Sequence, residues 1–418
     1  MIDYTKIPHT LLTSGKRGLE RENLRLDADG HLSKRMHTDV LGVSPNDAEL
    51  TLDFAECQLE LVTPPLDNIP KLIEYLKHTH HALTKKLGTE KLWPHSMPPA
   101  CDPGEVKIAH FGEDPDSKAK YIYRMGLCHR YGRMMQTICG IHYNVSFSPD
   151  LFQTLRLNQN EAYFKIIRNF YRFYPILIYL FGASPFCYPV SFKKHVDHSR
   201  FLQQQGDIYF GPQATSLRQS ELGYHNPYVA DLSPCYNSLE SYIRALEKAT
   251  STLYPPYAKI PTEQQLNANY LQIENEYYAP IRPKADPKIK VRPLTALQQD
   301  GVEYIEIRLL DLNPLLPLGI DGPTLAFLDL FLLYCLLTPD SLNVNCKDSK
   351  ERALTIAKFG RSTPWILDEG LKILETLKPL VQYLNQPLYQ EAWDLQLQKL
   401  NDSSKLPSAI ILNKLKHL

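Results

Sequence analysis

Apolar and polar residues alternate along several segments of the chain, a period that is typical of β-strands. These segments lie at about residues 18–26, 57–63, 134–148, 269–278 and 302–310. Elsewhere the apolar residues have the spacing of amphipathic helices. This spacing predicts helices over Asn68–Lys86, Asn158–Leu180, Ser238–Thr252, Pro323–Leu337, Lys350–Phe359 and Pro364–Leu384. Strands that are separated and followed by helices favour an α+β fold over a regular βαβ repeat.

Charged side chains gather on one face of the first two predicted strands, because side chains at positions i and i+2 point the same way. In GLERENLR, Glu20 and Glu22 share a face, and in CQLELVTPP, Gln58 and Glu60 do so. Asp53 lies just upstream of the second segment. Leucines fill the opposite face of that segment, which predicts one buried and one polar side.

Two further predicted strands repeat this arrangement. In MMQTICGIHYNVSF, one face carries Gln136, Ile138, His142 and Asn144. The other face carries Thr137, Cys139, Ile141, Tyr143 and Val145, which we interpret as core. In VEYIEIRLL, Glu306 and Arg308 fall together. A single glutamate pair is most often a solvated strand face, and a lone histidine is most often structural. Four such strands together favour a shared site.

Carboxylates that converge on one site repel one another or raise one another's pKa, and a divalent cation removes that cost. Oxygen ligands with at most one imidazole suit Mg²⁺ or Mn²⁺ rather than zinc. Magnesium in such sites usually bridges to substrate phosphates. The pattern therefore predicts a Mg²⁺-dependent, phosphate-handling enzyme on the face of an antiparallel sheet.

Composition narrows the range of partners and of compartments. The 418 residues include 46 Lys and Arg and 46 Asp and Glu, so no global field attracts nucleic acid or an anionic membrane. The N-terminus lacks the features of a signal peptide. The most apolar segment, 324–337, is too short to span a bilayer and contains Asp329. We expect a cytoplasmic protein, with eight cysteines that are reduced by default.

Other motifs give weaker evidence of a functional site. Cys139 and His142 have a zinc-like spacing, but there is no second pair, and strand alternation predicts that they face opposite ways. The histidines at 78, 80 and 81 lie on a charged predicted helix and are expected to be exposed. The chain contains no GxxxxGK[ST], no GxSxG, and no GxGxxG after a strand.

Seven ordered strings resemble one enzyme family. They are GLERENLR, DFAECQLELVTPP, YRMGLCHRYGRMMQTICGIHYNVSF, YLFGASP, ATSLR, QIENEYYAPIRPK and GVEYIEIRLLDLNP. Together they resemble glutamate–cysteine ligase of the gamma-proteobacterial type, from about residue 14 to 325. The final part of the chain matches only loosely, at AKFGR.

The resemblance implies a strongly curved, mainly antiparallel sheet whose inner face forms a funnel-like active site, as in the glutamine synthetase and guanido kinase type of catalytic fold. It suggests a catalytic region over 1–325 and a helical region over 326–418 packed on it, which could form one continuous domain. The implied reaction joins the γ-carboxylate of L-glutamate to the amine of L-cysteine. It consumes ATP, passes through γ-glutamyl phosphate and begins glutathione synthesis.

The resemblance also implies roles for individual residues. Two or three Mg²⁺ ions, or Mn²⁺, would be bound by Glu20, Glu22, Asp53, Glu60, His142 and Glu306. Arg308 would contact the transferred phosphate beside Glu306, and Arg124 would lie near ATP. Glutamate would be bound by Gln136, Ile138, Asn144 and Arg218. The cysteine pocket would consist of Phe54, Tyr123, Leu127, Tyr224 and Tyr278, although tyrosines are common in this chain and Tyr224 and Tyr278 could be ordinary packing.

Two alternatives stay open at this point. A related ligase could join glutamate to a different amine, and identification of the product would distinguish it. A catalytically silent binding protein is the second alternative, but such a protein would be expected to have lost some of the acidic ligands. We expect a monomer with glutamate, cysteine and ATP as partners, and with neither nucleic acid nor membrane among them.

Overall fold

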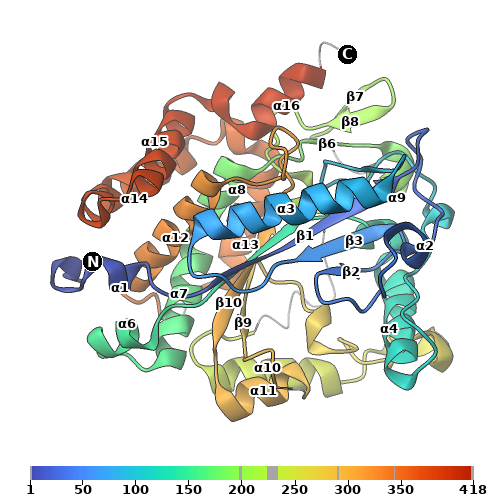
Figure 1. The fold of residues 1–418 in the computed structure, drawn as a ribbon, viewed down its shortest axis with the longest axis horizontal. Coiled ribbons are helices and arrows are strands. Elements are labelled where there is room, and N and C mark those ends of the chain that lie inside the picture. Colours follow the sequence, from blue (N-terminus) through green and yellow to red (C-terminus); the bar gives the residue numbers. More distant parts are fainter. Residues whose placement is uncertain (1, 197–199, 224–233, 290, 343, 416–418) are drawn as a thin grey trace.

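A mainly antiparallel sheet with helices packed around it forms the centre of the molecule (Figure 1). The computed structural model describes residues 2–196, 200–223, 234–289, 291–342 and 344–415. Within these residues no helix combines the length and the apolarity needed to cross a membrane. The predicted α+β class, with an antiparallel sheet, is confirmed.

The main sheet has the strand order β2-β3-β1-β5-β10-β9, and β4 pairs with the end of β1. Every one of these pairs is antiparallel. The strands are β1 (Arg17–Leu26), β2 (Leu50–Leu52), β3 (Gln58–Val62), β4 (Lys91–Leu92), β5 (Ile141–Val145), β9 (Ile281–Lys284) and β10 (Tyr304–Leu310). A small second sheet contains β6 (Phe186–Cys187), β7 (Gln203–Gln205) and β8 (Ile208–Phe210).

Most of the longer helices begin with a proline in the first turn, where the missing N–H costs nothing, or with a capping side chain such as Asn68. The helices before the second sheet are α1 (His9–Leu12), α2 (His37–Leu41), α3 (Ile69–Leu87), α4 (Pro115–Tyr131), α5 (Arg133–Gln136), α6 (Pro149–Thr154), α7 (Gln159–Phe173), α8 (Pro175–Phe181) and α9 (Pro189–Val196). Those after it are α10 (Leu239–Ser251), α11 (Pro293–Asp300), α12 (Gly322–Leu337), α13 (Cys346–Phe359), α14 (Pro364–Leu384), α15 (Pro387–Asn401) and α16 (Pro407–Leu415).

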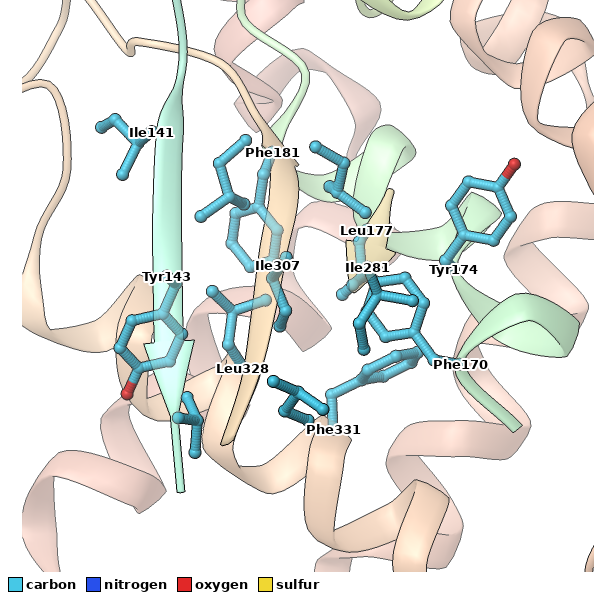
Figure 2. Packing of buried hydrophobic residues seen from close by; sticks show 14 of the residues in the cluster. Ile141, Tyr143, Phe170, Tyr174, Leu177, Phe181, Ile281, Ile307, Leu328 and Phe331 are labelled. Atoms are coloured by element: carbon cyan, nitrogen blue, oxygen red, sulfur yellow. The ribbon is translucent and has the colours of Figure 1, made fainter. Parts of the chain in front are cut away.

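The apolar face of the sheet packs against α7, α8 and α12. Figure 2 shows Tyr143 of β5 and Ile307 of β10 in this core together with Phe170, Phe181 and Phe331 of the helices. Each of these side chains is at least nine-tenths buried. Helix α12 is apolar all round, which is typical of a helix enclosed on every side. It lies between α7 and α15 and separates the sheet from the C-terminal helices.

A polar cluster interrupts this core. Asp329 of α12 accepts hydrogen bonds from Arg17 Nε at 3.0 Å, from Tyr143 Oη at 2.8 Å and from Tyr389 Oη at 3.3 Å. Arg17 Nη2 lies 2.9 Å from the same carboxylate, and both side chains are 2% exposed. This cluster therefore joins β1, β5, α12 and α15 with one balanced pair of charges.

Two predicted strands differ from the structure. Segment 134–148 is not one strand, because α5 occupies its start and β5 begins only at Ile141. The reason lies at Gly140, where a side chain would overlap the guanidinium of Arg218, so the backbone bends past this arginine. Segment 269–278 forms no strand, and a short turn at Glu274–Glu276 takes its place. Glu274 there accepts hydrogen bonds from Arg292 instead of facing a sheet.

The predicted helices are present, most of them with shifted ends, and the prediction of Pro364–Leu384 matches α14. The segment predicted as one helix over 158–180 is divided into α7 and α8 at Pro175, which cannot donate the backbone hydrogen bond that would continue α7. The sequence pattern did not predict α4 and α15, nor the shorter helices such as α9, α11 and α16.

Candidate active site

A cavity of about 310 Å³ opens on the polar face of the main sheet. Residues of β1, β3, β5, β9 and β10 line it, together with residues of α4 and α5. The register of the sheet explains this convergence, since Glu22 lies opposite Glu60, Glu20 opposite His142, and Glu306 opposite Arg282. Side chains that are paired across strands share a face, so each strand brings its polar residues to the same side.

One end of the cavity concentrates negative charge. Burial, followed by the charge of Asp53, raises the pKa of Glu22 to about 8. Burial and the neighbouring carboxylates of Glu20, Asp53 and Glu22 raise the pKa of Glu60 well above its ordinary value. Burial also raises the pKa of Asp53, which accepts a hydrogen bond from Gln58 Nε2 at 3.1 Å. Ionised together, these carboxylates need a cation.

His142 lies at the centre of the acidic residues. Its Nδ1 is 2.9 Å from Glu20 and its Nε2 is 3.6 Å from Glu22. Burial and the charge of Arg308 lower the pKa of this imidazole, which favours the neutral form that binds metals. Two sets of ligand atoms each lie within 4.8 Å of one another: Glu20, His142 and Glu306, and Glu22, Glu60 and His142.

Cys139 belongs to neither set among the described residues. It precedes β5, so the strand alternation used to place it opposite His142 does not apply there. Its thiol is fully buried and lies 3.8 Å from the side chain of Gln58. Burial raises the pKa of this thiol well above its ordinary value, which opposes a metal-binding thiolate.

The other end of the cavity concentrates positive charge. Glu306 lies 3.3 Å from Lys284 Nζ and 3.0 Å from Arg308 Nη1. Burial alone would raise the pKa of Glu306, but these two cations outweigh it and hold the pKa well below its ordinary value. Arg282 lines the same part of the cavity and donates to the backbone carbonyls of Asn275 and Tyr277. The carboxylate of Glu306 also lies within 4.8 Å of ligand atoms of Glu20 and His142, so the basic residues directly adjoin the acidic ones.

Two more arginines are held by backbone carbonyls. Arg124 of α4 donates from Nε to Asp53 O at 2.7 Å and lies over the ring of Phe111. Arg218 is buried and donates from Nη2 to Arg308 O at 2.9 Å, in the space that Gly140 leaves free. Both guanidinium groups are thus fixed in position and line the cavity.

The cavity gathers most of the residues that the sequence singled out. All six predicted metal ligands line it, as do Arg308 and Arg124. So do Gln136 and Arg218 of the glutamate set, and Phe54, Tyr123, Leu127 and Tyr278 of the cysteine set.

Two predicted site residues lie outside the lining of the cavity, and the placement of a third is not described. Ile138 is fully buried and does not line the cavity. Asn144 also lies outside the lining, and it donates from Nδ2 to Glu20 at 2.9 Å. Tyr224 lies outside the described residues. Gln136 lies on α5, so the prediction that it shares a strand face with His142 is wrong.

Sequence patterns missed several residues of the lining. Arg282 and Lys284 come from β9, a short strand that contains Pro283 and shows little alternation. Their only signal was the IRPK end of the string QIENEYYAPIRPK. Tyr131, Met135, Asn275 and Glu276 complete the lining.

Comparison with known proteins decides the family. The family model described as glutamate–cysteine ligase matches residues 4–357. The chain belongs to the glutamate–cysteine ligase family. It is thus a ligase, and the resemblance carried by the seven sequence strings is confirmed.

Relatives and solved structures agree with this assignment. The chain is 40% identical to the glutamate–cysteine ligase of Pseudomonas fluorescens, over 96% of this chain and 81% of the relative. It is also 40% identical to that of Alcanivorax borkumensis, over 96% and 83%. A crystal structure of the Francisella tularensis glutamate–cysteine ligase in complex with AMP matches with a TM-score of 0.89 and 33% identity, over 96% of this chain and 84% of the other. A bifunctional glutathione synthetase from Pasteurella multocida matches with a TM-score of 0.81 and 27% identity, over 97% of this chain and 50% of the other.

Proposed function

We propose that the cavity on the polar face of the sheet is the catalytic site of this ligase and that it works with Mg²⁺. ATP-dependent formation of γ-glutamylcysteine, the first step of glutathione synthesis, follows from membership of the family. The observation that supports the site assignment is the cavity itself, in which clustered carboxylates adjoin Lys284 and Arg308.

The acidic end fits a hard divalent cation. Its donors are carboxylate oxygens with one neutral imidazole, a set that suits Mg²⁺ or Mn²⁺. Burial and mutual repulsion raise the pKa values of Glu22 and Glu60, so these groups gain from a bound cation. The residues that would hold the ions are Glu20, Glu22, Asp53, Glu60, His142 and Glu306. When bound, the metal would neutralise charge as the glutamate carboxylate approaches the γ-phosphate of ATP.

The basic end is suited to the phosphate that is transferred. In the first step an oxygen of the glutamate γ-carboxylate attacks the γ-phosphorus of ATP, and the bond to ADP breaks. Arg308 and Lys284, which both pair with Glu306, would contact the phosphoryl oxygens. Glu306 keeps both cations in place through its ion pairs. The Francisella relative was solved with AMP, which agrees with a nucleotide site in this fold.

The second step forms the amide bond. The amine of cysteine attacks the γ-carbonyl carbon of glutamyl phosphate, and phosphate leaves with the electrons of the broken bond. Arg218 offers a fork of N–H groups to the α-carboxylate of glutamate. Phe54, Tyr123, Leu127 and Tyr278 line the same cavity with side chains that suit a small thiol. Tyr278 Oη is fixed by a hydrogen bond from Gln219 Nε2 at 3.3 Å.

Other properties stay predictions: action in the cytoplasm, a monomeric state, and the division into regions 1–325 and 326–418. Helix α12 continues across that division, from Gly322 to Leu337.

Product analysis tests the proposed chemistry. The protein is incubated with ATP, glutamate labelled with ¹⁸O in its γ-carboxylate, and cysteine, with Mg²⁺ or with EDTA. We expect γ-glutamylcysteine and ¹⁸O in the released phosphate, and no product with EDTA. Label in AMP would contradict the acyl phosphate route. Equal turnover with EDTA would contradict the metal, and a product only with another amine would identify a different acceptor.

A further inference from the structure

A second cavity lies behind β1, on the side opposite the catalytic cavity. Arg21 and Asn23 of β1 line it, whereas Glu20 and Glu22 of the same strand line the catalytic cavity. Helix α3 packs on this side of the sheet (Figure 1). The rear cavity has a volume of about 390 Å³, within the range of small-molecule sites.

Arg21 carries a buried positive charge that lacks an anionic partner. Its side chain is 3% exposed. The guanidinium donates from Nη1 to Leu318 O at 3.2 Å and from Nη2 to His80 Nδ1 at 3.0 Å. Both acceptors are neutral and belong to residues that line the rear cavity. No carboxylate among the described residues forms an ion pair with Arg21, and its Nε has no partner there.

Among the described residues, Glu90 is the carboxylate that lines the rear cavity, and it is already neutralised. Glu90 accepts hydrogen bonds from Arg25 Nη1 at 2.7 Å and from Ser33 Oγ at 2.6 Å. Arg35 Nη1 lies 3.9 Å from its other oxygen. Lys91 lines the same cavity and is exposed, so the further charge that the described part of the chain brings there is positive.

His80 does not supply the missing negative charge. Because its Nδ1 accepts from a guanidinium, the ring is neutral and carries its proton on Nε2. Burial and the charge of Arg21 lower the pKa of His80 to about 4, so it stays neutral at physiological pH. This half-buried position corrects the expectation that the histidines of α3 are all exposed.

A buried arginine without an anion lowers the free energy of unfolding. Because a guanidinium stays protonated in proteins, loss of its proton does not relieve this cost. We propose that the rear cavity binds a small organic monocarboxylate whose carboxylate pairs with Arg21. The carbon skeleton would contact Leu87, Leu92, Leu312 and Leu316, which line the same cavity. Arg21 is a buried guanidinium that balances one negative charge, whereas the charge of Lys91 is exposed and solvated. A monocarboxylate therefore fits better than a phosphate.

Thermal unfolding tests this site with butyrate and hexanoate as probes. Butyramide and hexanamide have nearly the same shape without the charge, and sodium chloride keeps the ionic strength constant. The variant Arg21→Met removes the cation. Thr84→Phe fills the cavity from the exposed surface of α3 and leaves Arg21 in place. It therefore tests whether the carboxylate binds in this cavity even if Arg21→Met fails to fold. Arg35→Met, at an exposed arginine beside Glu90, is the matched control.

We expect the carboxylates to raise the Tm of the wild type by about 2 °C at ten times the dissociation constant. The rise should persist in Arg35→Met and disappear in Arg21→Met and Thr84→Phe. It should also persist in Arg308→Met, which excludes binding in the catalytic cavity. An equal rise with the amides, a rise lost only in Arg308→Met, or stabilisation by phosphate but not by carboxylates would each overturn the proposal.

Discussion

Two groups of buried charges lie on opposite faces of the main sheet and are built differently. On the apolar face, Asp329 faces one guanidinium and two phenol hydroxyls at 2.8 to 3.3 Å. On the polar face, Glu22 receives one backbone N–H, from Gly140 at 2.8 Å, and burial together with the charge of Asp53 outweighs the effect of Arg218 and Arg308, so that its pKa is raised. The first group is balanced by the protein itself, whereas the second is not.

The difference separates a structural role from a catalytic one. A buried charge that the fold balances holds secondary-structure elements together, and its removal lowers the free energy of unfolding. A buried charge that the fold leaves unbalanced lowers the stability of the free protein. Such a residue is retained at sites where a bound ligand balances its charge. The two groups should therefore respond in opposite ways to the same kind of substitution, an acid replaced by its amide.

The largest effect is expected at Asp329. Changing Asp329 to Asn leaves Arg17 buried without a counter-ion and should lower the free energy of unfolding by about 3 to 5 kcal/mol. Denaturant unfolding measures this loss, and kcat/KM per folded molecule should stay near the wild-type value. Asp394→Asn, at a half-buried side chain of α15 that accepts a hydrogen bond from Gln390, is the control and should change little. A loss below about 1 kcal/mol would mean that the pair does not hold α12 to the sheet.

Glu60→Gln should show the reverse pattern. The substitution removes one of several repelling carboxylates, so the metal-free protein should be as stable as the wild type or more stable. Activity should fall by about 100-fold or more and require a higher Mg²⁺ concentration. Initial rates over a Mg²⁺ titration measure this. Glu49→Gln, at an exposed glutamate that bonds to Tyr75, should leave both quantities unchanged. Wild-type rates without extra Mg²⁺ would remove Glu60 from the ligand set.

A smaller effect is expected from pH. The pKa of Glu22 is raised from 4.5 to about 8, so between these values the folded protein binds a proton that the unfolded chain does not. Stability is then full below about pH 4.5 and is lost as the pH rises towards 8. In EDTA, Tm should fall by about 2 to 5 °C between pH 6 and pH 9.

Saturating Mg²⁺ should reduce this fall, because the metal stabilises the ionised carboxylates, and Glu22→Gln should flatten it. Differential scanning calorimetry at matched ionic strength provides the measurement. A Tm that rises over this pH range in EDTA would show that Glu22 is already ionised in the free protein.

Local patterns were sufficient to predict the faces of β1, β3 and β10, because alternation depends only on neighbouring residues. They could not give the register between strands. Glu20 and His142 are 122 residues apart in the chain, and their hydrogen bond depends on how β1 and β5 align. The family resemblance, rather than the pattern, united these residues in one ligand set.

The remaining errors arise where tertiary contacts override local preference. Gly140 allows Arg218 to approach and thereby breaks a segment that alternates like one strand. Lys284 lies on a strand of four residues, too short to show a period. His80 was expected to be exposed because its own helix is charged, and only the packing of α3 on β1 reveals its contact with Arg21.

The strand order has a consequence for how this protein is made. The central strand β1 is among the first segments to leave the ribosome, but its neighbour β5 follows more than a hundred residues later, and β10 more than a hundred residues after that. Until β9 and β10 are made, the acidic face of β1 lacks the cations Lys284 and Arg308. Strand β5 likewise has an unpaired edge until β10 is made. Such distant pairings form slowly and leave exposed edges that favour aggregation. Nascent chains that stop before about residue 310 should therefore depend on chaperones, whereas chains that include β10 can close the sheet.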